Sequence, residues 1–177
     1  NGADGEWRAE ISIAGKRGAA LTAMEQVRAQ TDGPDLDYLF APLKRSRLDY
    51  MVQKAVEMGV ARLRPVLTRR TIAERVNLER MRANAIEAAE QCGVLRVPDV
   101  AEPVKLAAVI EAWDAGRRLI FCDEEASLSN PLEALRMGLF QPGGGARQGT
   151  AAPPLAVLIG PEGGFSPEER QMLVSKP

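Results

Sequence analysis

The spacing of apolar side chains along the chain switches between a strand pattern and a helix pattern. Residues 7–13 alternate apolar and polar side chains, which predicts a half-buried strand. Residues 155–159 form a continuous apolar run that is too short for a helix, which predicts a buried parallel strand. Further strands are expected at residues 38–43, 60–67 and 119–122.

Helical spacing separates these strands. Apolar residues within 48–56 recur at helical intervals, and Gly59 is placed to end that helix. Other helices are expected at 77–92, around 106–113 and from Pro131. Strands that alternate with helices predict an α/β domain with a mainly parallel sheet.

Two segments are expected to lie outside the regular elements. Residues 25–37 are polar, and Asp32-Gly33-Pro34-Asp35 within them predicts a turn or linker. Residues 141–154 are rich in Gly, Pro, Ala and Gln, which predicts a flexible loop. The linker divides the chain into a small β unit with its linker at 1–34 and an α/β domain at 35–177.

The stretch 155–169, LAVLIGPEGGFSPEE, carries the strongest functional signal. The apolar run stops at Gly160, and Ser166 with Glu169 three residues later forms a capping box at the start of a helix. A glycine-rich turn therefore links the carboxyl end of a buried strand to a helix. Open α/β sheets bind ligands at that end of their strands, and glycines let the backbone approach a ligand closely.

The spacing of the turn matches neither of the common phosphate-binding patterns. Gly160, Gly163 and Gly164 do not give G-x-G-x-x-G, and no Lys-Ser or Lys-Thr pair follows them as in a P-loop. This disfavours a generic nucleotide-binding enzyme. Read alone, the turn is equally typical of a tight strand-to-helix connection.

Composition narrows the chemistry. The chain contains no histidine, and Cys92 and Cys122 form no CxxC pair, so we expect no metal site and no Ser-His-Asp or Cys-His catalysis. No apolar run approaches the ~20 residues that span a bilayer. Reduced thiols and the lack of a signal peptide favour a cytoplasmic protein, although the missing initial Met suggests a piece of a longer chain.

Positive charge is concentrated in one part of the sequence. From Lys44 to Arg75 there are nine Lys or Arg and three Asp or Glu, a local charge of +6, although the whole chain carries −1. This asymmetry suggests one basic face. Such a face is either ordinary solvated surface or a binding surface for an anionic partner such as RNA.

Three segments in order now resemble a known family: 45–60 (RSRLDYMVQKAVEMGV), 87–93 (EAAEQCG) and 158–166 (LIGPEGGFS). They are similar to the RsmE-type methyltransferases of 16S ribosomal RNA, which belong to the SPOUT class and have an α/β domain with a C-terminal trefoil knot. The resemblance covers residues 38–175. The opening residues also resemble the last part of that family's N-terminal PUA-like β-barrel.

The resemblance implies a function and an assembly. It implies S-adenosylmethionine as methyl donor, uridine N3 in 16S rRNA of the small subunit as acceptor, and a homodimer with each cofactor pocket near the subunit interface. The family continues with a Leu-Gly-containing loop and a final helix that complete the knot and the pocket. The knot is therefore expected to be incomplete in this chain, and residues 1–34 to be the barrel's remnant and linker.

The resemblance also assigns residues. The knot loop that wraps the cofactor matches Leu158, Ile159, Gly160, Pro161, Glu162, Gly163 and Gly164. Uridine N3 must lose a proton and no histidine is present, so a carboxylate, a water or an arginine-stabilised uridinate must serve. Glu162 is the candidate for proton removal or for polar contact with the substrate, with a structural role in the turn as the alternative. For Phe121 and Cys122, which precede another expected knot loop, burial in the core is favoured over cofactor contact.

Basic residues are the candidates for RNA contact. Those expected to position rRNA phosphates are Lys44, Arg45, Arg47, Arg69 and Arg70. Lys54 lies three residues before Glu57 on one helix, so a local ion pair is favoured there. Members of the family carry an Arg at the position after Gly93, where this chain has Val94. Either Arg96 takes over the role of that Arg, or the role is absent. An arginine near the target, such as Arg96, could stabilise a uridinate anion.

Two other functions stay open at this point. One is a non-catalytic RNA-binding or ribosome-assembly module that keeps the fold. The other is a SPOUT methyltransferase that acts on tRNA. Neither the particular uridine nor the assembly stage of the substrate can be read from the sequence.

Overall fold

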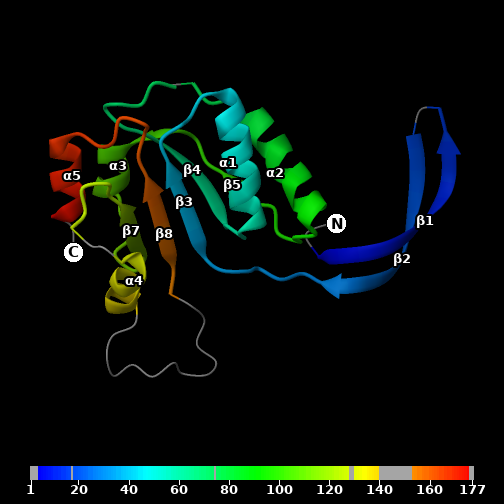
Figure 1. Ribbon diagram of the computed structural model, residues 1–177. Coiled ribbons are helices and arrows are strands. Elements are labelled where there is room, and N and C mark those ends of the chain that lie inside the picture. Colours follow the sequence, from blue (N-terminus) through cyan, green and yellow to red (C-terminus); the bar gives the residue numbers. More distant parts are fainter. Residues whose placement is uncertain (1–3, 17, 74, 128–129, 140–152, 176–177) are drawn as a thin grey trace.

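The chain forms one parallel sheet with helices on both faces and a separate two-stranded ribbon (Figure 1). The computed structural model describes residues 4–16, 18–73, 75–127, 130–139 and 153–175. The loop predicted at 141–154 lies outside the described residues except for its last two positions.

The sheet confirms the predicted α/β class. Its strands run parallel in the order β5-β4-β3-β8-β7, and β6 pairs with the end of β4. Two short strands, β5 and β6, were not predicted because two residues are too few for any periodicity. The strands are β3 (Leu36–Phe40), β4 (Arg62–Leu67), β5 (Asp99–Val100), β6 (Val104–Lys105), β7 (Arg118–Cys122) and β8 (Leu155–Ile159).

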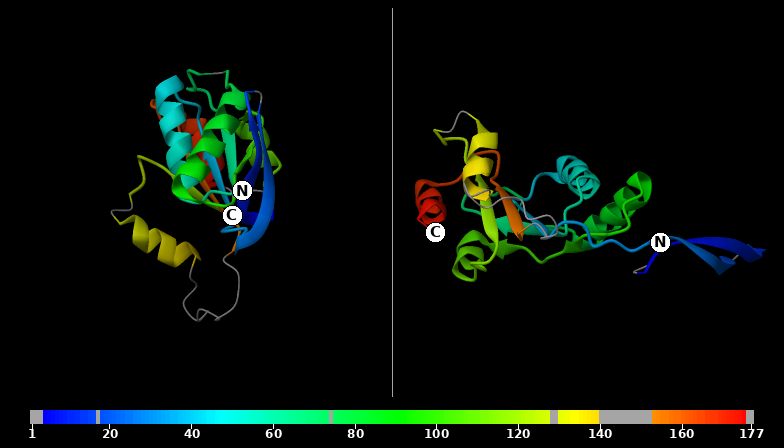
Figure 2. Two further views of the ribbon diagram at one scale, coloured as in Figure 1. Left: turned by 90° about the vertical axis from the view of Figure 1, so that its right-hand side faces the viewer. Right: turned by 90° about the horizontal axis from the view of Figure 1, so that it is seen from below.

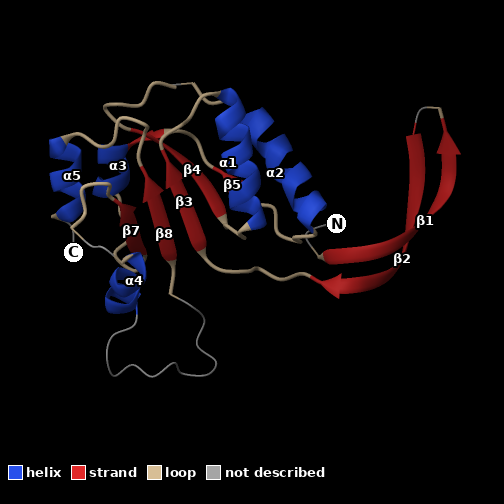
Figure 3. Cartoon of the chain, viewed as in Figure 1, coloured by secondary structure: helices blue, strands red, loops and turns tan. Residues whose placement is uncertain are grey.

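Helices cover the two faces of the sheet (Figures 1 and 3). Leu39 and Phe40 are neighbours in β3 and point to opposite faces, so each anchors a different core. Phe40 packs with α1 and α2, whereas Leu39 packs with α3 and α5. The helices are α1 (Arg45–Glu57), α2 (Leu78–Cys92), α3 (Leu106–Glu111), α4 (Pro131–Leu139) and α5 (Pro167–Val174).

The predicted helix ends are confirmed. Gly59 follows α1 with φ +81°, a conformation that a side chain disfavours. The Asn77 side chain caps α2 by accepting from the Arg80 N–H at 2.9 Å. Ser166 and Glu169 form the expected capping box at the start of α5, and Pro167 occupies its first turn.

The N-terminal ribbon consists of β1 (Gly5–Gly15) and β2 (Gly18–Ala29), which pair antiparallel and project away from the sheet (Figures 1 and 2). The strand expected at 7–13 is confirmed as part of β1, but its expected half-burial is wrong, because Ile11 and Ile13 are about two thirds exposed. The turn or linker predicted at 32–35 lies between β2 and β3, whereas the first residues of the polar stretch, 25–29, belong to β2. Nearly all residues of the ribbon are exposed, so polar residues are compatible with a strand at this place. Arg28 of β2 forms an ion pair with Glu6 of β1.

One strand boundary and one burial prediction also change. The strand expected at 38–43 runs from 36 to 40. Ile159 is 40% exposed although its run is apolar throughout. Ala156 and Leu158 point into the core under α3 and α5, whereas the opposite face of β8 is left partly open among the described residues.

The amino edge of the sheet, where the parallel strands begin, is held by buried charge. Asp37 is 2% exposed and pairs with Arg62, with Arg64 at 2.9 Å and with Arg117 at 3.6 Å. Beside it, the hydrogen bond from Arg117 lowers the pKa of the Asp35 carboxyl below its ordinary value. The expectation of a single basic face is therefore wrong for Arg62 and Arg64, which turn inward to these carboxylates.

Replacing Asp37 by Asn is expected to destabilise the protein by about 3 kcal/mol, because it leaves partly buried arginines without their shared carboxylate. The free energy of unfolding in urea measures this. Asp49→Asn is the matched control: Asp49 also pairs with an arginine, Arg80 at 2.6 Å, but on the surface. It should cost no more than about 1 kcal/mol. Equal losses in the two variants would contradict a special role for Asp37.

Candidate functional site

Loops from several strands meet at the carboxyl edge of the sheet, the edge at which its parallel strands end (Figure 1). β8 lies between β3 and β7. The segment that follows β8 is therefore flanked on both sides by the segments that follow its neighbours. This segment is the glycine turn, Gly160–Phe165. The sequence predicted that it follows a buried strand, and the strand order gives it a central place in the edge.

The glycines of the turn are required by close packing and by backbone conformation. The Gly164 N–H donates to the Pro161 carbonyl at 2.9 Å, and Gly164 has φ +68°. A Cβ on Gly160 would lie 2.6 Å from the ring of Phe165. That ring meets Phe121 edge-on at 5.0 Å between centroids. The turn is thus folded back over an aromatic pair.

A small cavity of about 210 Å³ opens between the glycine turn and the end of β7. Its β7 side is acidic, with Asp123, Glu124 and Glu125, and the Arg170 Nε donates to Asp123 at 2.7 Å. Phe121 is partly buried and packs against the core, so the prediction of core burial is confirmed in part. The same prediction is wrong for Cys122, which is exposed and lines the cavity. The cavity is smaller than the ~300–1,000 Å³ usual for ligand sites.

The predicted cofactor residues present different groups. Leu158 is fully buried in the core, so only its backbone is available at the edge. Ile159, Gly160, Pro161 and Gly164 line the cavity. Glu162 and Gly163 are exposed at the tip of the turn. The turn's hydrogen bond is accepted by the Pro161 carbonyl and not by the Glu162 carboxylate, which leaves that carboxylate facing solvent.

The loop after β4 is fastened to the glycine turn. We call residues Thr68–Thr71 the clamp loop. The Arg70 Nη1 donates to the Gly163 carbonyl at 2.6 Å. The Arg69 N–H donates to Oε1 of Glu169 at 2.8 Å, and the Arg69 guanidinium meets Glu168 at 3.0 Å on the surface. Both arginines predicted to contact RNA therefore already contact the segment 163–169.

The remaining basic candidates are exposed near the same edge. Lys44, Arg45 and Arg47 lie at the start of α1, directly after the loop that leaves β3. Lys54 is paired with Glu57 at 2.8 Å, as expected. Sequence reasoning missed two cations that lie near this group, Arg75 and Lys105.

Arg75 connects two cavities at this edge. It lines a cavity of about 870 Å³ together with Lys44 and Arg45, and another of about 650 Å³ together with Arg69 and Lys105. The charge count of the 44–75 run contained Arg75, but nothing in the pattern set it apart. Lys105 lies outside the run, so only the fold brings it near.

Arg96 lies far from the glycine turn within one chain. It follows α2 and precedes β5, whose first residue pairs with the start of β4. Its guanidinium donates to the carbonyl of Asp32, just before β3. Arg96 is therefore at the amino edge, and the structure does not bring it together with Glu162.

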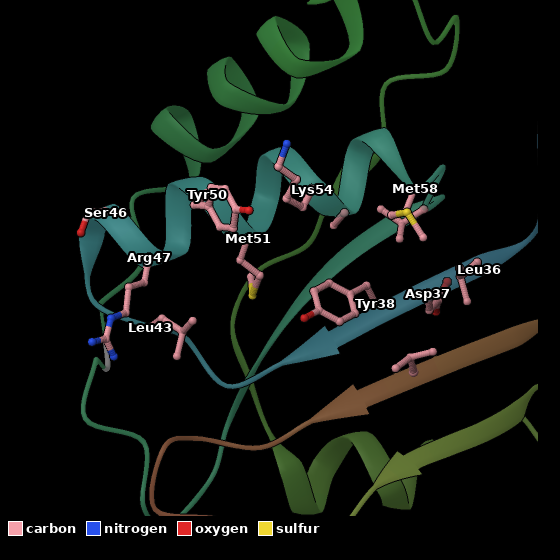
Figure 4. A pocket seen from close by; sticks show the side chains of 13 residues that line it. Leu36, Asp37, Tyr38, Leu43, Ser46, Arg47, Tyr50, Met51, Lys54 and Met58 are labelled. Atoms are coloured by element: carbon pink, nitrogen blue, oxygen red, sulfur yellow. The ribbon is translucent and has the colours of Figure 1, made fainter. Parts of the chain in front are cut away.

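An apolar groove of about 640 Å³ lies between α1 and the open face of β3 and β8, and we call it the helix groove (Figure 4). Met51 points from α1 toward Tyr38 on β3 (Figure 4). Burial raises the pKa of the Tyr38 hydroxyl. Tyr50 is 63% and Met58 79% exposed at its rim, so a large apolar surface faces solvent.

The described part of the chain offers neither a metal site nor a membrane-spanning helix. No group of three His, Cys, Asp or Glu side chains there is arranged to hold a metal ion. None of the helices there is both long enough and apolar enough to cross a membrane.

Comparison with known sequences identifies relatives over nearly the whole chain. A profile of the family described as RNA methyltransferase domain matches residues 31–176. The ribosomal RNA small subunit methyltransferase E of Rickettsia conorii is 25% identical over 175 residues, which cover 99% of this chain and 66% of that protein. The protein of the same name from Synechocystis is 26% identical, and this chain covers 55% of its length. The chain thus spans less than two thirds of either relative.

Solved structures show the same fold. A candidate methyltransferase from Legionella pneumophila, in complex with S-adenosylmethionine, matches with a TM-score of 0.76 and 25% identity, over 98% of this chain and 68% of that one. The ribosomal RNA small subunit methyltransferase E of Neisseria gonorrhoeae, bound to S-adenosylmethionine, matches with a TM-score of 0.74 and 24% identity. The match covers 98% of this chain and 68% of that one. These findings confirm the resemblance and a SPOUT-like α/β fold with a mainly parallel sheet.

Replacing Gly160 by Ala is expected to lower the free energy of unfolding by about 1–3 kcal/mol, because the new Cβ would collide with the Phe165 ring. Gly163→Ala is the control in the same turn. Its Cβ would meet only the Arg70 side chain at an ordinary 3.6 Å, so the change should be small. Chemical denaturation of both variants checks this, and a neutral Gly160→Ala would disprove the close packing.

Proposed function

The chain belongs to the RNA methyltransferase domain family, and we propose that it transfers a methyl group from S-adenosylmethionine to a uridine N3 in 16S rRNA of the small ribosomal subunit. The observation that carries the proposal is the position of the glycine turn. The motif that resembles the family's cofactor loop lies at the centre of the carboxyl edge, where α/β sheets bind ligands.

The residues of the edge suit this cofactor. S-adenosylmethionine supplies a methyl group on a positively charged sulfur and carries an ammonium group. The acidic wall of Asp123, Glu124 and Glu125 complements positive charge at this place. The backbone of Ile159–Gly164 is available for hydrogen bonds, and the small cavity agrees with a pocket completed by the further loop and helix that the resemblance implies.

The chain's own chemical task is to remove a proton. Uridine N3 keeps its proton at neutral pH, so a base must take it as the nitrogen attacks the methyl carbon. The bond between that carbon and sulfur would break at the same time, and its electron pair would stay on sulfur, which leaves as a neutral thioether. We assign that role to Glu162, whose carboxylate is exposed at the tip of the turn. Most of the remaining rate would come from holding the base and the donor in line.

The exposed cations near the carboxyl edge would hold the RNA backbone. Lys44, Arg45 and Arg47 lie on one side of the clamp loop, and Arg69 lies within it. We add Arg75 and Lys105, because they line the adjoining cavities. Since the proposed substrate is ribosomal, the protein would act in the cytoplasm.

The assembly follows the resemblance as well. We propose a homodimer that buries the helix groove, whose rim residues Tyr50 and Met58 are otherwise exposed apolar surface. We further propose that 35–177 is a methyltransferase domain with an incomplete knot. The β1–β2 ribbon, within 1–34, would be part of a PUA-like barrel, because Ile11, Ile13 and Leu21 stay about two thirds exposed without further strands.

The experiment that tests the function is methyl transfer by the full-length protein from radiolabelled S-adenosylmethionine to 30S subunits that lack N3-methyluridine. Nuclease digestion and mass spectrometry would map the product. A single N3-methyluridine in 16S rRNA supports the proposal. Transfer to tRNA instead would leave the fold and cofactor standing and replace the substrate, whereas cofactor binding without transfer to any RNA would point to a non-catalytic module.

Glu162→Gln should lower kcat by about 10²–10⁴-fold, because the amide cannot accept the uridine proton. Its affinity for the methyl donor should change little, because Glu162 is exposed and does not line the cavity. Single-turnover methylation of 30S subunits measures the effect. Glu111→Gln, an exposed carboxylate at the end of α3, is the control. Full turnover by Glu162→Gln would show that another group removes the proton.

Arg96 can serve the reaction only from a second subunit, because it lies at the amino edge of its own sheet. Arg96→Ala and Glu162→Gln subunits, each inactive alone, should therefore recover activity when they are mixed and allowed to exchange. In such a heterodimer one site would receive an intact Glu162 from one subunit and an intact Arg96 from the other. No recovery, or an active Arg96→Ala protein, would remove Arg96 from the chemistry.

A further inference from the structure

We propose that Arg70 is a positioning residue of the glycine turn, because its guanidinium holds the Gly163 carbonyl in place. Glu169 supports this contact, since it holds the clamp loop in the position from which Arg70 reaches that carbonyl. The proposal rests on the proposed function in one respect, because it takes the glycine turn as the site of the methyl donor. It makes donor affinity depend on an arginine that follows a different strand.

The first contact is that of Arg70 itself. Its Nη1 donates to the Gly163 carbonyl at 2.6 Å, between residues 93 positions apart in the sequence. The aliphatic stem lies alongside Gly163, since a Cβ there would be 3.6 Å from Cδ and 3.9 Å from Cβ of Arg70. A charged donor makes a stronger hydrogen bond to a carbonyl than a neutral donor does.

The second contact fixes the clamp loop. Glu169 is 6% exposed and uses both carboxylate oxygens on backbone N–H groups. Oε1 accepts from Arg69 at 2.8 Å and Oε2 from Ser166 at 3.0 Å. One carboxylate thus ties the residue before Arg70 to the residue after the glycine turn. The amide of a glutamine cannot accept both hydrogen bonds, because its NH₂ group is a donor and would face a backbone N–H, which is also a donor.

The turn needs such support from outside. Adjacent glycines at 163 and 164 give the backbone more freedom than any other residue pair, and Gly164 already occupies a left-handed conformation. Within the turn, one hydrogen bond joins Gly164 to Pro161. Arg70 adds a second restraint on the same peptide segment, so the backbone groups that would face the donor are held in place before it binds.

This role differs from the RNA-phosphate contact that the sequence suggested for Arg70, and the two can be separated. A phosphate contact affects RNA affinity and its salt dependence, and leaves donor affinity without RNA unchanged. A positioning contact affects donor affinity without any RNA.

The test is isothermal titration of the full-length protein with S-adenosylmethionine in the absence of RNA. Arg70→Ala should weaken binding by about tenfold, because donor binding must then supply the free energy of ordering the turn that the charged hydrogen bond supplies in the wild type. The affinity of Arg70→Lys for S-adenosylmethionine should lie between those of the wild type and Arg70→Ala. Arg82→Ala is the matched control, because Arg82 is also an exposed arginine that donates to a backbone carbonyl, that of Val100 at 3.4 Å. Its donor affinity should equal that of the wild type.

A second variant and a second measurement make the result decisive. Glu169→Gln should weaken donor binding in the same direction, and combining it with Arg70→Ala should cost less than the sum of the two. Hydrogen exchange of the ligand-free protein should be faster at the Gly164 amide in Arg70→Ala than in Arg82→Ala. Circular dichroism confirms that each variant is folded.

The outcomes separate the two proposals. Wild-type affinity in Arg70→Ala with unchanged exchange would overturn the positioning role. If the wild-type protein binds no S-adenosylmethionine, the proposed donor is wrong, and the exchange measurement alone decides whether Arg70 orders the turn.

Discussion

The position of β8 between β3 and β7 is the constraint on which the site depends. A strand that enters the sheet between two others delivers the residues that follow it to the middle of the carboxyl edge. The glycine turn therefore has the β3 and β7 loops on either side, and its Gly163 carbonyl lies within reach of Arg70 in the clamp loop. Residues distant in sequence, such as Arg70 and Gly163 or Arg69 and Glu169, become neighbours only because of this strand order.

The two edges of the sheet differ in how their charged side chains are placed. At the amino edge, Asp37 is buried among three arginines, and the resulting network binds β3, β4 and the start of β7 together. At the carboxyl edge, the charged side chains of Lys44, Arg45 and Arg47 are exposed and the backbone turns sharply at glycines. The buried charge network lies at one edge of the sheet, and the proposed cofactor and RNA contacts lie at the other.

Local features could be read from the sequence, and features that depend on strand order could not. The apolar run of β8, the cap at Asn77 and the capping box at Ser166 each lie within a few residues, so their patterns were sufficient. Arg62 and Arg64 looked like part of a basic face because their partner, Asp37, lies about 25 residues away on a neighbouring strand. Arg70 was a candidate for RNA contact because of its charge, but its contact with Gly163 required the fold. The placement of Arg96 at the opposite edge likewise followed only from the direction of α2.

The central claim is that the glycine turn holds the methyl donor. The most direct test is a nuclear magnetic resonance titration of the isotopically labelled full-length protein with S-adenosylmethionine. The account predicts that the largest shifts fall on the amides of Ile159–Phe165 and on the end of β7, and that the amino edge around Asp37 stays unchanged. Shifts centred on the amino edge or on the β1–β2 ribbon, with the glycine turn silent, would contradict it.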